Sequence, residues 1–170
     1  MDAVCGQDSG KAGWLEGIVK KHELSLRRMC FLYLRDLSLA EDAVQETFVK
    51  AYQRAESFRG ECSEETWLMR IAINTCKDMR KSAWFRYVDR RVSLDSLPEP
   101  AQPFSEEDSL LTLEVMKLPR KLLEAVLLYH YQGMTVREAA QALGITAPSV
   151  SARLKKAHDK LRGALEGERL

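Results

Sequence analysis

Residues 38–84, SLAEDAVQETFVKAYQRAESFRGECSEETWLMRIAINTCKDMRKSAW, decide the fold, because apolar side chains recur in two stretches of this segment at helical spacing. Each recurrence is typical of an amphipathic helix with one buried face. The residues expected in the first buried face are Ala40, Ala43, Val44, Thr47, Phe48, Ala51 and Tyr52. Those expected in the second are Trp67, Leu68, Ile71, Ala72, Thr75 and Met79.

The segment also carries start signals for both helices. Ser38 and Glu41 have the S-x-x-E spacing of a capping box, which predicts that the first helix begins there. Ser63 follows a polar loop and is expected to cap the second helix. Glu64 and Glu65 then fall in its first turn, where the helix dipole favours acidic side chains.

The surfaces that the two helices turn outward differ in charge. The first is acidic and polar, and contains Glu41, Asp42, Gln45 and Glu46. The second carries a stripe formed by Arg70, Asn74, Lys77 and Lys81. Residues 70–91 hold seven basic and two acidic side chains, with aromatic residues such as Trp84 nearby, which suits a phosphate backbone and unpaired bases. Either surface is also compatible with an ordinary solvated helix.

A helix-turn-helix pattern lies near the C-terminus. Thr135 and Glu138 form a second capping box, and Gly144 can adopt the positive φ that ends a short helix. Thr146 can cap the next helix, whose first turn tolerates Pro148. The buried stripe expected along this helix, over residues 147–162, contains Val150, Leu154, Ala157 and Leu161.

The outer face of the 147–162 helix suits the major groove of duplex DNA. Small and hydroxyl side chains near its start allow close approach, Arg153 can pair with a guanine edge, and lysines can hold phosphates. The residues expected at the DNA are Thr146, Pro148, Ser149, Ser151, Ala152, Arg153, Lys155 and Lys156. A purely structural helical hairpin is the alternative interpretation.

Length and composition predict an all-α protein of two small helical domains. The chain has 170 residues, of which 45% are hydrophobic, enough for two small cores. Residues 95–108 contain three prolines and several acids but no basic residue, which predicts a flexible linker. A net charge of only +1 predicts weak DNA binding by the isolated protein. The expected boundaries are residues 1–92 for the first domain, 93–112 for the linker and 113–170 for the second domain.

The cysteines and histidines form no metal-binding pattern, and no metal site is predicted. No signal peptide or membrane-spanning run is evident, so free thiols in a reducing cytoplasm are expected. Cys62 precedes a helix N-terminus that can stabilise a thiolate, so redox sensing at Cys62 is a hypothesis. His22, His130 and His158 are widely separated in sequence, and packing or surface roles are expected for them.

No catalytic constellation or phosphate-binding loop is present, so we predict a binding protein rather than an enzyme, without cofactor or small-molecule substrate. One alternative is a helix-turn-helix regulator that binds duplex operators without polymerase, usually as a dimer. Another is an RNA-binding adaptor, against which the duplex-reading helix argues.

The strings AEDAVQETFVKAY, FRGECSEETWLMRIAINTCKDMRK and LPRKLLEAVLLYHYQGMTVREAAQALGITAPSVSARLKKAHDKLR resemble the extracytoplasmic-function sigma factors of bacterial RNA polymerase. The resemblance spans roughly residues 14–165, with both signatures in the family's order. It implies a sigma region 2 domain and a sigma region 4 domain. It also implies three partners: core RNA polymerase, through its β′ clamp helices and β flap; promoter DNA; and an anti-sigma factor, which is often attached to the membrane.

The resemblance also implies residue roles. Core polymerase would be bound by Asp42, Gln45, Glu46 and Thr47. The melted −10 element would be bound by Arg59, Gly60, Glu61, Cys62, Ser63, Asn74, Lys77, Asp78, Arg80, Lys81 and Trp84. The 147–162 helix would read the −35 element as duplex DNA. In one departure, many relatives carry an aromatic residue where this chain has Glu64 and Glu65.

Overall fold

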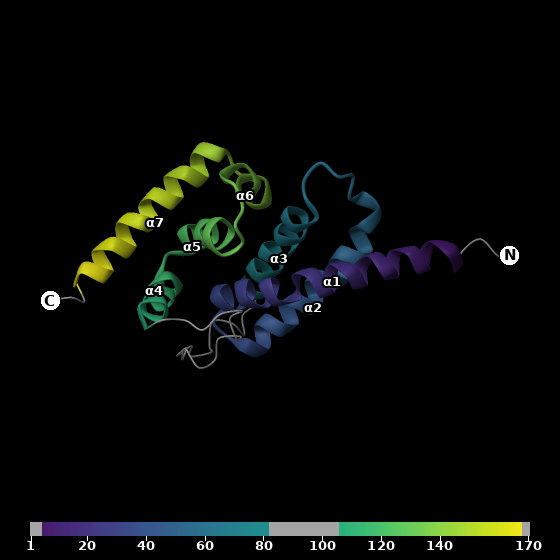
Figure 1. Ribbon diagram of the computed structural model, residues 1–170, viewed down its shortest axis with the longest axis horizontal. Coiled ribbons are helices and arrows are strands. Elements are labelled where there is room, and N and C mark those ends of the chain that lie inside the picture. Colours follow the sequence, from purple (N-terminus) through teal and green to yellow (C-terminus); the bar gives the residue numbers. More distant parts are fainter. Residues whose placement is uncertain (1–4, 82–105, 168–170) are drawn as a thin grey trace.

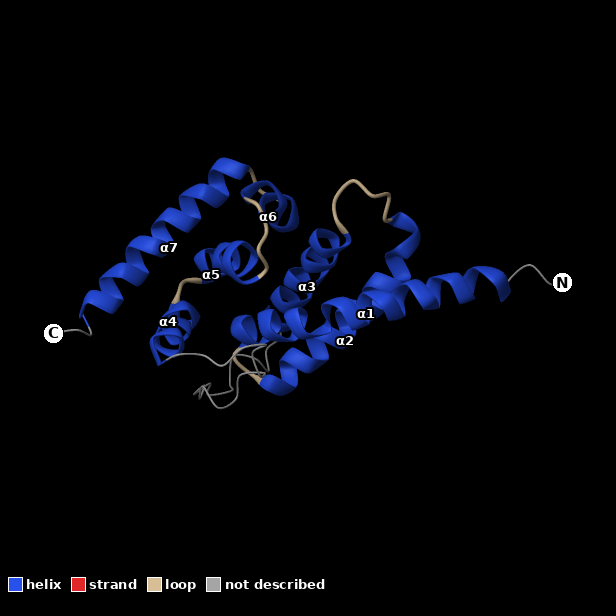
Figure 2. Cartoon of the chain, in the orientation of Figure 1, coloured by secondary structure: helices blue, strands red, loops and turns tan. Residues whose placement is uncertain are grey.

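The computed structural model describes residues 5–81 and 106–167, with side chains from residue 10 in the first part and residue 110 in the second. Every regular element in these two parts is a helix (Figure 2), which confirms the all-α prediction. No helix in the described parts is long and apolar enough to cross a lipid bilayer. Trp84 and the proline-bearing tract of the predicted linker lie outside the described residues.

The N-terminal half consists of α1 (Cys5–Leu34), α2 (Leu37–Arg54), the short 3₁₀ helix η1 (Ala55–Ser57) and α3 (Glu64–Lys81). Each of the three long helices packs against the other two. Their contact buries large side chains completely, among them Leu26, Phe31, Tyr33, Leu68 and Ile73. Removing this apolar surface from water is the main stabilising contribution to the bundle.

Helix α2 begins one residue before the predicted capping box. Its N-cap is Asp36, whose carboxylate accepts a hydrogen bond from the backbone N–H of Leu39 at 2.8 Å. Arg35, with φ of 60°, turns the chain between α1 and α2. Because Asp36 already caps the helix, Ser38 lies inside its first turn, and the capping-box prediction was wrong here. The predicted apolar face is confirmed as fully buried at Ala40, Ala43, Val44, Thr47 and Ala51.

Helix α3 is buried on two sides rather than one. Its predicted cap is confirmed, because the backbone N–H of Thr66 donates to Ser63 Oγ at 3.1 Å. Besides the expected face, Met69, Ile73 and Cys76 are fully buried. These residues were not predicted, because the apolar period indicates one buried face, whereas α3 packs against α1, α2 and α6.

The C-terminal half consists of α4 (Glu106–Lys117), α5 (Arg120–Val126), the π-helical turn η4 (Leu127–Tyr131), α6 (Val136–Leu143) and α7 (Ala147–Gly167). Helix α7 packs against α4, α5 and α6. Residues 106–112, assigned above to the linker, belong to α4. Acidic residues at the start of α4 suit a helix N-terminus, which a composition-based boundary overlooks.

The helix-turn-helix prediction is confirmed in detail. Thr135 and Glu138 form a complete capping box, and Gly144 ends α6 in the left-handed conformation with φ of 65°. Pro148 stands in the first turn of α7, where its missing N–H costs nothing. The buried residues of α7 are Val150, Leu154, Ala157 and Leu161, as predicted.

The two halves contact each other through α6 against α3 and through α5 and η4 against α1 (Figure 1). The hydroxyl of Tyr33 in α1 donates to the Glu124 carboxylate in α5 at 3.0 Å, and Gln132 Nε2 donates to the carbonyl of Ser25 at 3.2 Å. Helix α7 lies at the end of the molecule opposite the start of α1. The described chain is therefore a closed arrangement of two helical units.

Candidate nucleic-acid interface

A groove of about 550 Å³ separates the outer faces of α2 and α3. It is lined on the α2 side by Asp42, Gln45, Glu46 and Val49, and Val49 is 51% exposed among these polar neighbours. Lys50 spans the groove, pairing with Glu46 at 3.4 Å and donating to Thr75 Oγ1 at 3.2 Å. The groove therefore presents an acidic rim around an exposed apolar side chain.

The structure places two of the assigned residues differently from the roles that the resemblance implies. Thr47 is fully buried, and its hydroxyl donates to the carbonyl of Ala43 at 2.6 Å, so its side chain is part of the core and not of the surface. Asp78 lines the groove together with Asp42 and Glu46. It lies fifteen residues beyond Ser63 on the same helix, roughly 20 Å along the helix axis.

The loop between η1 and α3 is fixed at both of its ends by aromatic side chains. Phe58, directly before the loop, stacks on Trp67 with ring centroids 5.1 Å apart, and Trp67 lies 5.9 Å from Trp14 of α1. The Trp14 indole N–H donates to Glu64, directly after the loop, at 3.0 Å. Gly60, with φ of 73°, provides the left-handed turn between these ends. Between these ends the backbone forms a short, solvent-exposed loop.

The loop side chains assigned to the −10 element are mostly exposed, namely those of Arg59, Glu61 and Ser63. Cys62 is half-buried, and this burial raises the pKa of its thiol, with the Arg70 charge opposing the shift. This raised pKa runs against the stabilised thiolate that the nearby helix N-terminus led us to expect. Cys62 is a protonated thiol at neutral pH.

The assigned residues of α3 divide into exposed and engaged groups. Asn74 and Lys81 are exposed, with Lys81 3.7 Å from Asp78. Arg80 lies against Tyr33, donating to its carbonyl at 3.4 Å, with the guanidinium 5.6 Å from the ring centroid. Lys77 points toward the C-terminal half and pairs with Glu124 at 3.5 Å. Only part of the predicted basic stripe therefore faces solvent in this arrangement.

Glu124 joins both halves of the molecule. Glu124 is only 3% exposed, and its carboxylate accepts a hydrogen bond from the Tyr33 hydroxyl. The same carboxylate pairs with Lys77 and, at 3.7 Å, with Arg153 of α7. Burial and the Glu124 charge raise the pKa of Tyr33, so this hydroxyl stays protonated and donates. One buried carboxylate therefore holds a cation from each of the two helices that we assigned to DNA.

The outer face of α7 is largely open. Thr146 caps the helix through a 3.4 Å hydrogen bond from the backbone N–H of Ser149, and the two hydroxyls lie 2.8 Å apart. Arg153 is partly buried by its contact with Glu124. The other assigned residues are all exposed: Pro148, Ser149, Ser151, Ala152, Lys155 and Lys156. The helix thus offers a continuous face of small, hydroxyl and cationic side chains.

Comparison with known families covers both halves of the chain. Residues 18–86 match the family model for sigma-70 region 2, and residues 109–161 match the model for sigma-70 region 4. The RNA polymerase sigma-H factor of Pseudomonas aeruginosa is 26% identical over 163 residues, covering 88% of this chain and 84% of that protein. SigL, an extracytoplasmic-function sigma factor of Mycobacterium tuberculosis, is 29% identical over 172 residues, covering 98% and 97%.

The chain belongs to the extracytoplasmic-function sigma factors of the sigma-70 family. Sigma factors are non-enzymatic initiation factors that bind core RNA polymerase and direct it to promoters. Two solved structures share the fold of this sigma factor. CnrH in complex with the cytosolic domain of CnrY matches with a TM-score of 0.72 and 24% identity, covering 94% of this chain and 92% of that one. RpoE in complex with the anti-sigma factor NepR from Bartonella quintana matches with a TM-score of 0.72 and 23% identity. This match covers 89% of this chain and 98% of that one.

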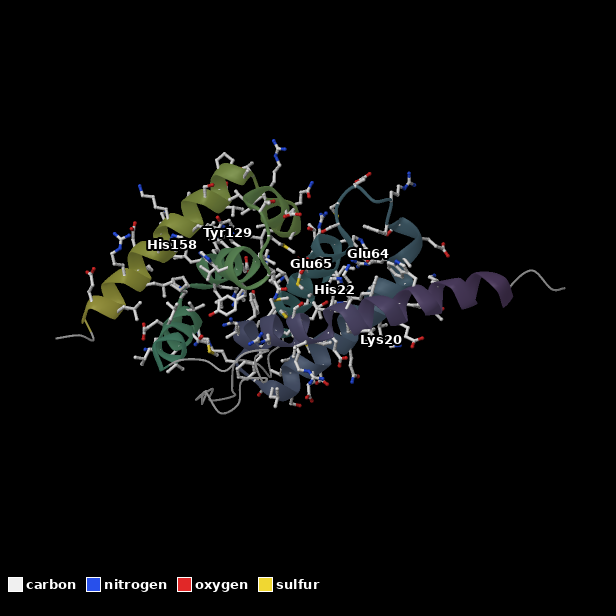
Figure 3. The ribbon with its side chains drawn as sticks, viewed as in Figure 1. Lys20, His22, Glu64, Glu65, Tyr129 and His158 are labelled. Carbon is white, nitrogen blue, oxygen red and sulfur yellow. The ribbon has the colours of Figure 1, made fainter. Side chains whose placement is uncertain are left out.

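Two features of this sigma factor were missed by sequence reasoning. Glu124 lies 91 positions from Tyr33, so no local pattern could connect them. His130 and His158, treated above as unrelated, meet with their Nε2 atoms 2.8 Å apart, and the Tyr129 ring packs edge-on against His130. Figure 3 labels Tyr129 and His158. Burial and the neighbouring His158 lower the pKa of His130. Within the described parts, no group of three potential ligands is placed to hold a metal ion.

Proposed function

We propose that this sigma factor binds core RNA polymerase through the α2–α3 groove defined above. The acidic rim of Asp42 and Glu46 around exposed Val49 offers both charge complementarity and apolar contact to a basic helical partner such as the β′ clamp helices. Gln45 adds an amide that can hydrogen-bond. Asp78, placed beside these residues, belongs to the same surface in our proposal. Buried Thr47 supports the groove from inside.

A second polymerase contact is proposed on the C-terminal half. An apolar hollow of about 400 Å³ is lined by Leu111, Val115, Val126, His130, Tyr131, His158 and Leu161. Leu111 and Tyr131 of this lining are exposed, and so are Leu110 and Tyr129, which adjoin lining residues in the sequence. Such a patch suits the apolar face of a helix, and the β flap is our proposed occupant.

The melted −10 strand is proposed to bind the loop of residues 59–63 and the exposed side of α3. A base flipped into the loop leaves its stack, and the phosphates that follow can contact cations such as Arg59 and Lys81. Asn74 is an exposed amide on the same helix and can contact a base edge. Glu64, one of the two acidic residues that depart from the family pattern, accepts a hydrogen bond from Trp14, so it supports the loop rather than facing DNA.

The −35 element is proposed to bind α7 as duplex DNA. The exposed face around Ser149 and Ala152 permits close approach to a major groove, while Lys155 and Lys156 can contact phosphates. Arg153 is the candidate for a guanine edge, provided that it exchanges Glu124 for the base. The proposed domains are residues 1–92 for region 2 and 113–170 for region 4, with region 4 extended to the start of α4.

We also propose a protein inhibitor for this chain. The two solved structures with the same fold are complexes with CnrY and with the anti-sigma factor NepR. An anti-sigma factor that covers the exposed apolar patch of the C-terminal half would prevent polymerase binding through that patch. We place the protein in the cytoplasm, with membrane attachment through such an inhibitor.

The observation that carries the proposal is the succession of region 2 and region 4 on two helical halves with distinct acidic and basic faces. The test is in vitro transcription with core RNA polymerase on a genomic promoter library. Initiation that requires this protein supports the proposal and reveals both promoter elements. Tight binding of the isolated protein to palindromic duplex operators, without any stimulation of transcription, would instead favour the polymerase-independent regulator.

A further inference from the structure

A hollow of about 510 Å³ lies beside the loop of residues 59–63, where the start of α1 passes η1. It is lined by Gly10, Lys11, Trp14, Ala55, Glu56 and Phe58. None of these residues was assigned a role by sequence or by family resemblance. The hollow is distinct from the α2–α3 groove, with which it shares no lining residue.

The aromatic side chains of the hollow are held rigidly. Trp14 is packed 5.9 Å from Trp67, and its indole N–H is occupied by Glu64. Phe58 is packed on Trp67 from the other side of the cluster. Both lining rings are half-buried, so part of each can contact a ligand. Fixed, partly exposed aromatic rings are the usual platforms on which unpaired bases stack.

The charged side chains of the hollow can rearrange at low cost. Lys11 lies 4.9 Å from the centroid of the Tyr52 ring and pairs with Glu56 at 3.4 Å. The Glu56 side chain is 87% exposed, so this ion pair is solvent-screened and weak. Lys11 can therefore turn to a phosphate when one is present. Arg59, exposed and adjacent to Phe58 in sequence, is a second cation at the same edge.

The hollow adjoins one end of the loop to which base capture is assigned. Phe58 is the residue before the loop, and Glu64, which Trp14 holds, is the residue after it. A strand whose base enters the loop can therefore reach the hollow with an adjoining nucleotide. A stacking surface and two cations at this point favour such a contact.

We propose that the hollow lined by Trp14, Phe58 and Lys11 binds a second unpaired nucleotide of the promoter strand, adjoining the one captured by the loop. Its base stacks on Trp14 and Phe58, and its phosphate contacts Lys11 and Arg59. This inference rests on the proposed −10 role of the loop. It gives region 2 of this protein two base-binding positions instead of one.

The test fills the hollow without removing any of its side chains. Gly10 lines the hollow, and a Cβ atom added there meets no atom within 4 Å, so Gly10→Leu introduces an apolar side chain at this position with room at its Cβ. Gly17, also in α1, is equally free of contacts but does not line the hollow, so Gly17→Leu is the matched control. Both changes replace helical glycine and are expected to favour the helix. Phe58→Leu, which keeps apolar bulk against Trp67, is a second test variant.

The probe is a single-stranded oligonucleotide that wild-type holoenzyme selects from a randomised pool, with 2-aminopurine placed at each position in turn. We expect fluorescence quenching at a position adjoining the captured base, in wild type and in Gly17→Leu but not in Gly10→Leu or Phe58→Leu. Affinity should fall roughly tenfold in the two test variants, since stacking of one base is lost.

The possible failures are separable. If wild-type holoenzyme selects no single-stranded sequence, the proposed −10 function is wrong and this inference falls with it. If a sequence is selected but quenching and affinity are the same in Gly10→Leu, Phe58→Leu and wild type, the loop captures DNA alone and the second nucleotide site is overturned.

Discussion

Helices α3 and α7, the two helices assigned to DNA, are built into the protein in opposite ways. In α3, eight of 18 residues are buried, because α1 and α2 cover one side and α6 covers another. In α7, four of 21 residues are buried along one stripe, and the rest of the helix is open. A helix that enters a major groove needs such an open face, whereas a single strand can follow a narrow line of contacts. Their burial thus matches the two proposed modes of recognition.

The two helices nevertheless share one anchor. Lys77 of α3 and Arg153 of α7 both pair with buried Glu124. Each cation is a DNA candidate, so binding to phosphate or base must compete with the same carboxylate. The closed arrangement therefore opposes DNA binding by both helices at once.

The largest expected effect is a loss of stability, and it tests whether α3 is more deeply buried than α7. Ile73 of α3 is fully buried, while Leu154 of α7 is buried with 6% of its surface exposed, on a helix that is open on its other faces. Ile73→Ala should lower the free energy of unfolding by about 4 kcal/mol and Leu154→Ala by about 2 kcal/mol, because the more enclosed site leaves the larger cavity. Urea denaturation of both variants measures the difference. Equal losses would mean that α3 is no more enclosed than α7.

A smaller effect is expected from releasing the shared anchor. Glu124→Gln keeps an oxygen for the Tyr33 hydroxyl but removes the charge that holds Lys77 and Arg153. We expect the variant to bind non-specific duplex DNA more tightly, with a salt dependence steeper by roughly 1 to 2 in log–log slope.

The matched control for this change is Glu23→Gln. Glu23 pairs with Arg27 at the surface of α1, at 3.2 Å, so the variant has the same change in net charge without freeing a DNA candidate. Filter binding or anisotropy at several salt concentrations measures both slopes. The shared-anchor account is contradicted if the two variants behave alike.

Each of the two helices also carries side chains that act on a histidine with a lowered pKa. Burial lowers the pKa of His22, although Glu64 and Glu65 at the start of α3 oppose the shift, and these three residues are grouped in Figure 3. Burial and His158 of α7 lower the pKa of His130. The unfolded chain takes up these protons near the ordinary pKa of 6.5, whereas the folded protein resists until lower pH.

The contribution of these two histidines to the free energy of unfolding should therefore be fully present above pH 6.5. It should decline as the pH falls from 6.5 toward the lowered pKa values. Chemical denaturation at a series of pH values between 8 and 5 is the measurement. His130→Gln should reduce the slope while leaving the contribution of His22. An unchanged slope in this variant would remove His130 from the account.

The smallest effect is expected at Cys62. Since burial raises the pKa of this thiol, it should react with iodoacetamide more slowly than a small free thiol at pH 7.5. Cys62→Ser should transcribe and respond to oxidant like wild type. An oxidant response that disappears in Cys62→Ser would restore the redox hypothesis.

The parts of the fold that sequence predicted correctly depend on local interactions. The Thr135–Glu138 capping box, the left-handed Gly144 and the buried stripe of α7 each involve residues a few positions apart. The cap of α2 was misplaced by similar reasoning, because Asp36 and Ser38 are both good caps and only the turn at Arg35 decides between them. Local patterns thus predict that a helix forms more reliably than where it starts.

The parts that sequence could not predict depend on contacts between the halves. The apolar period predicts one buried side of α3, and Met69, Ile73 and Cys76 were missed because α1, α2 and α6 together cover more than that side. Glu124 resembles any other acidic residue on a helix until Tyr33, Lys77 and Arg153 surround it. The second proposed base site likewise needs Trp14 of α1 beside Phe58, residues far apart in the chain.

The central claim is that this protein works through core RNA polymerase by means of its acidic groove, and a charge reversal tests it most directly. Transcription is measured with core polymerase and wild type, Asp42→Lys/Glu46→Lys, or the control Glu16→Lys/Glu23→Lys. The control reverses two exposed acids of α1, with side chains 67% and 47% exposed, outside the groove. We predict loss of initiation by roughly tenfold or more in the groove variant and near wild-type activity in the control. Undiminished transcription by Asp42→Lys/Glu46→Lys would contradict the account.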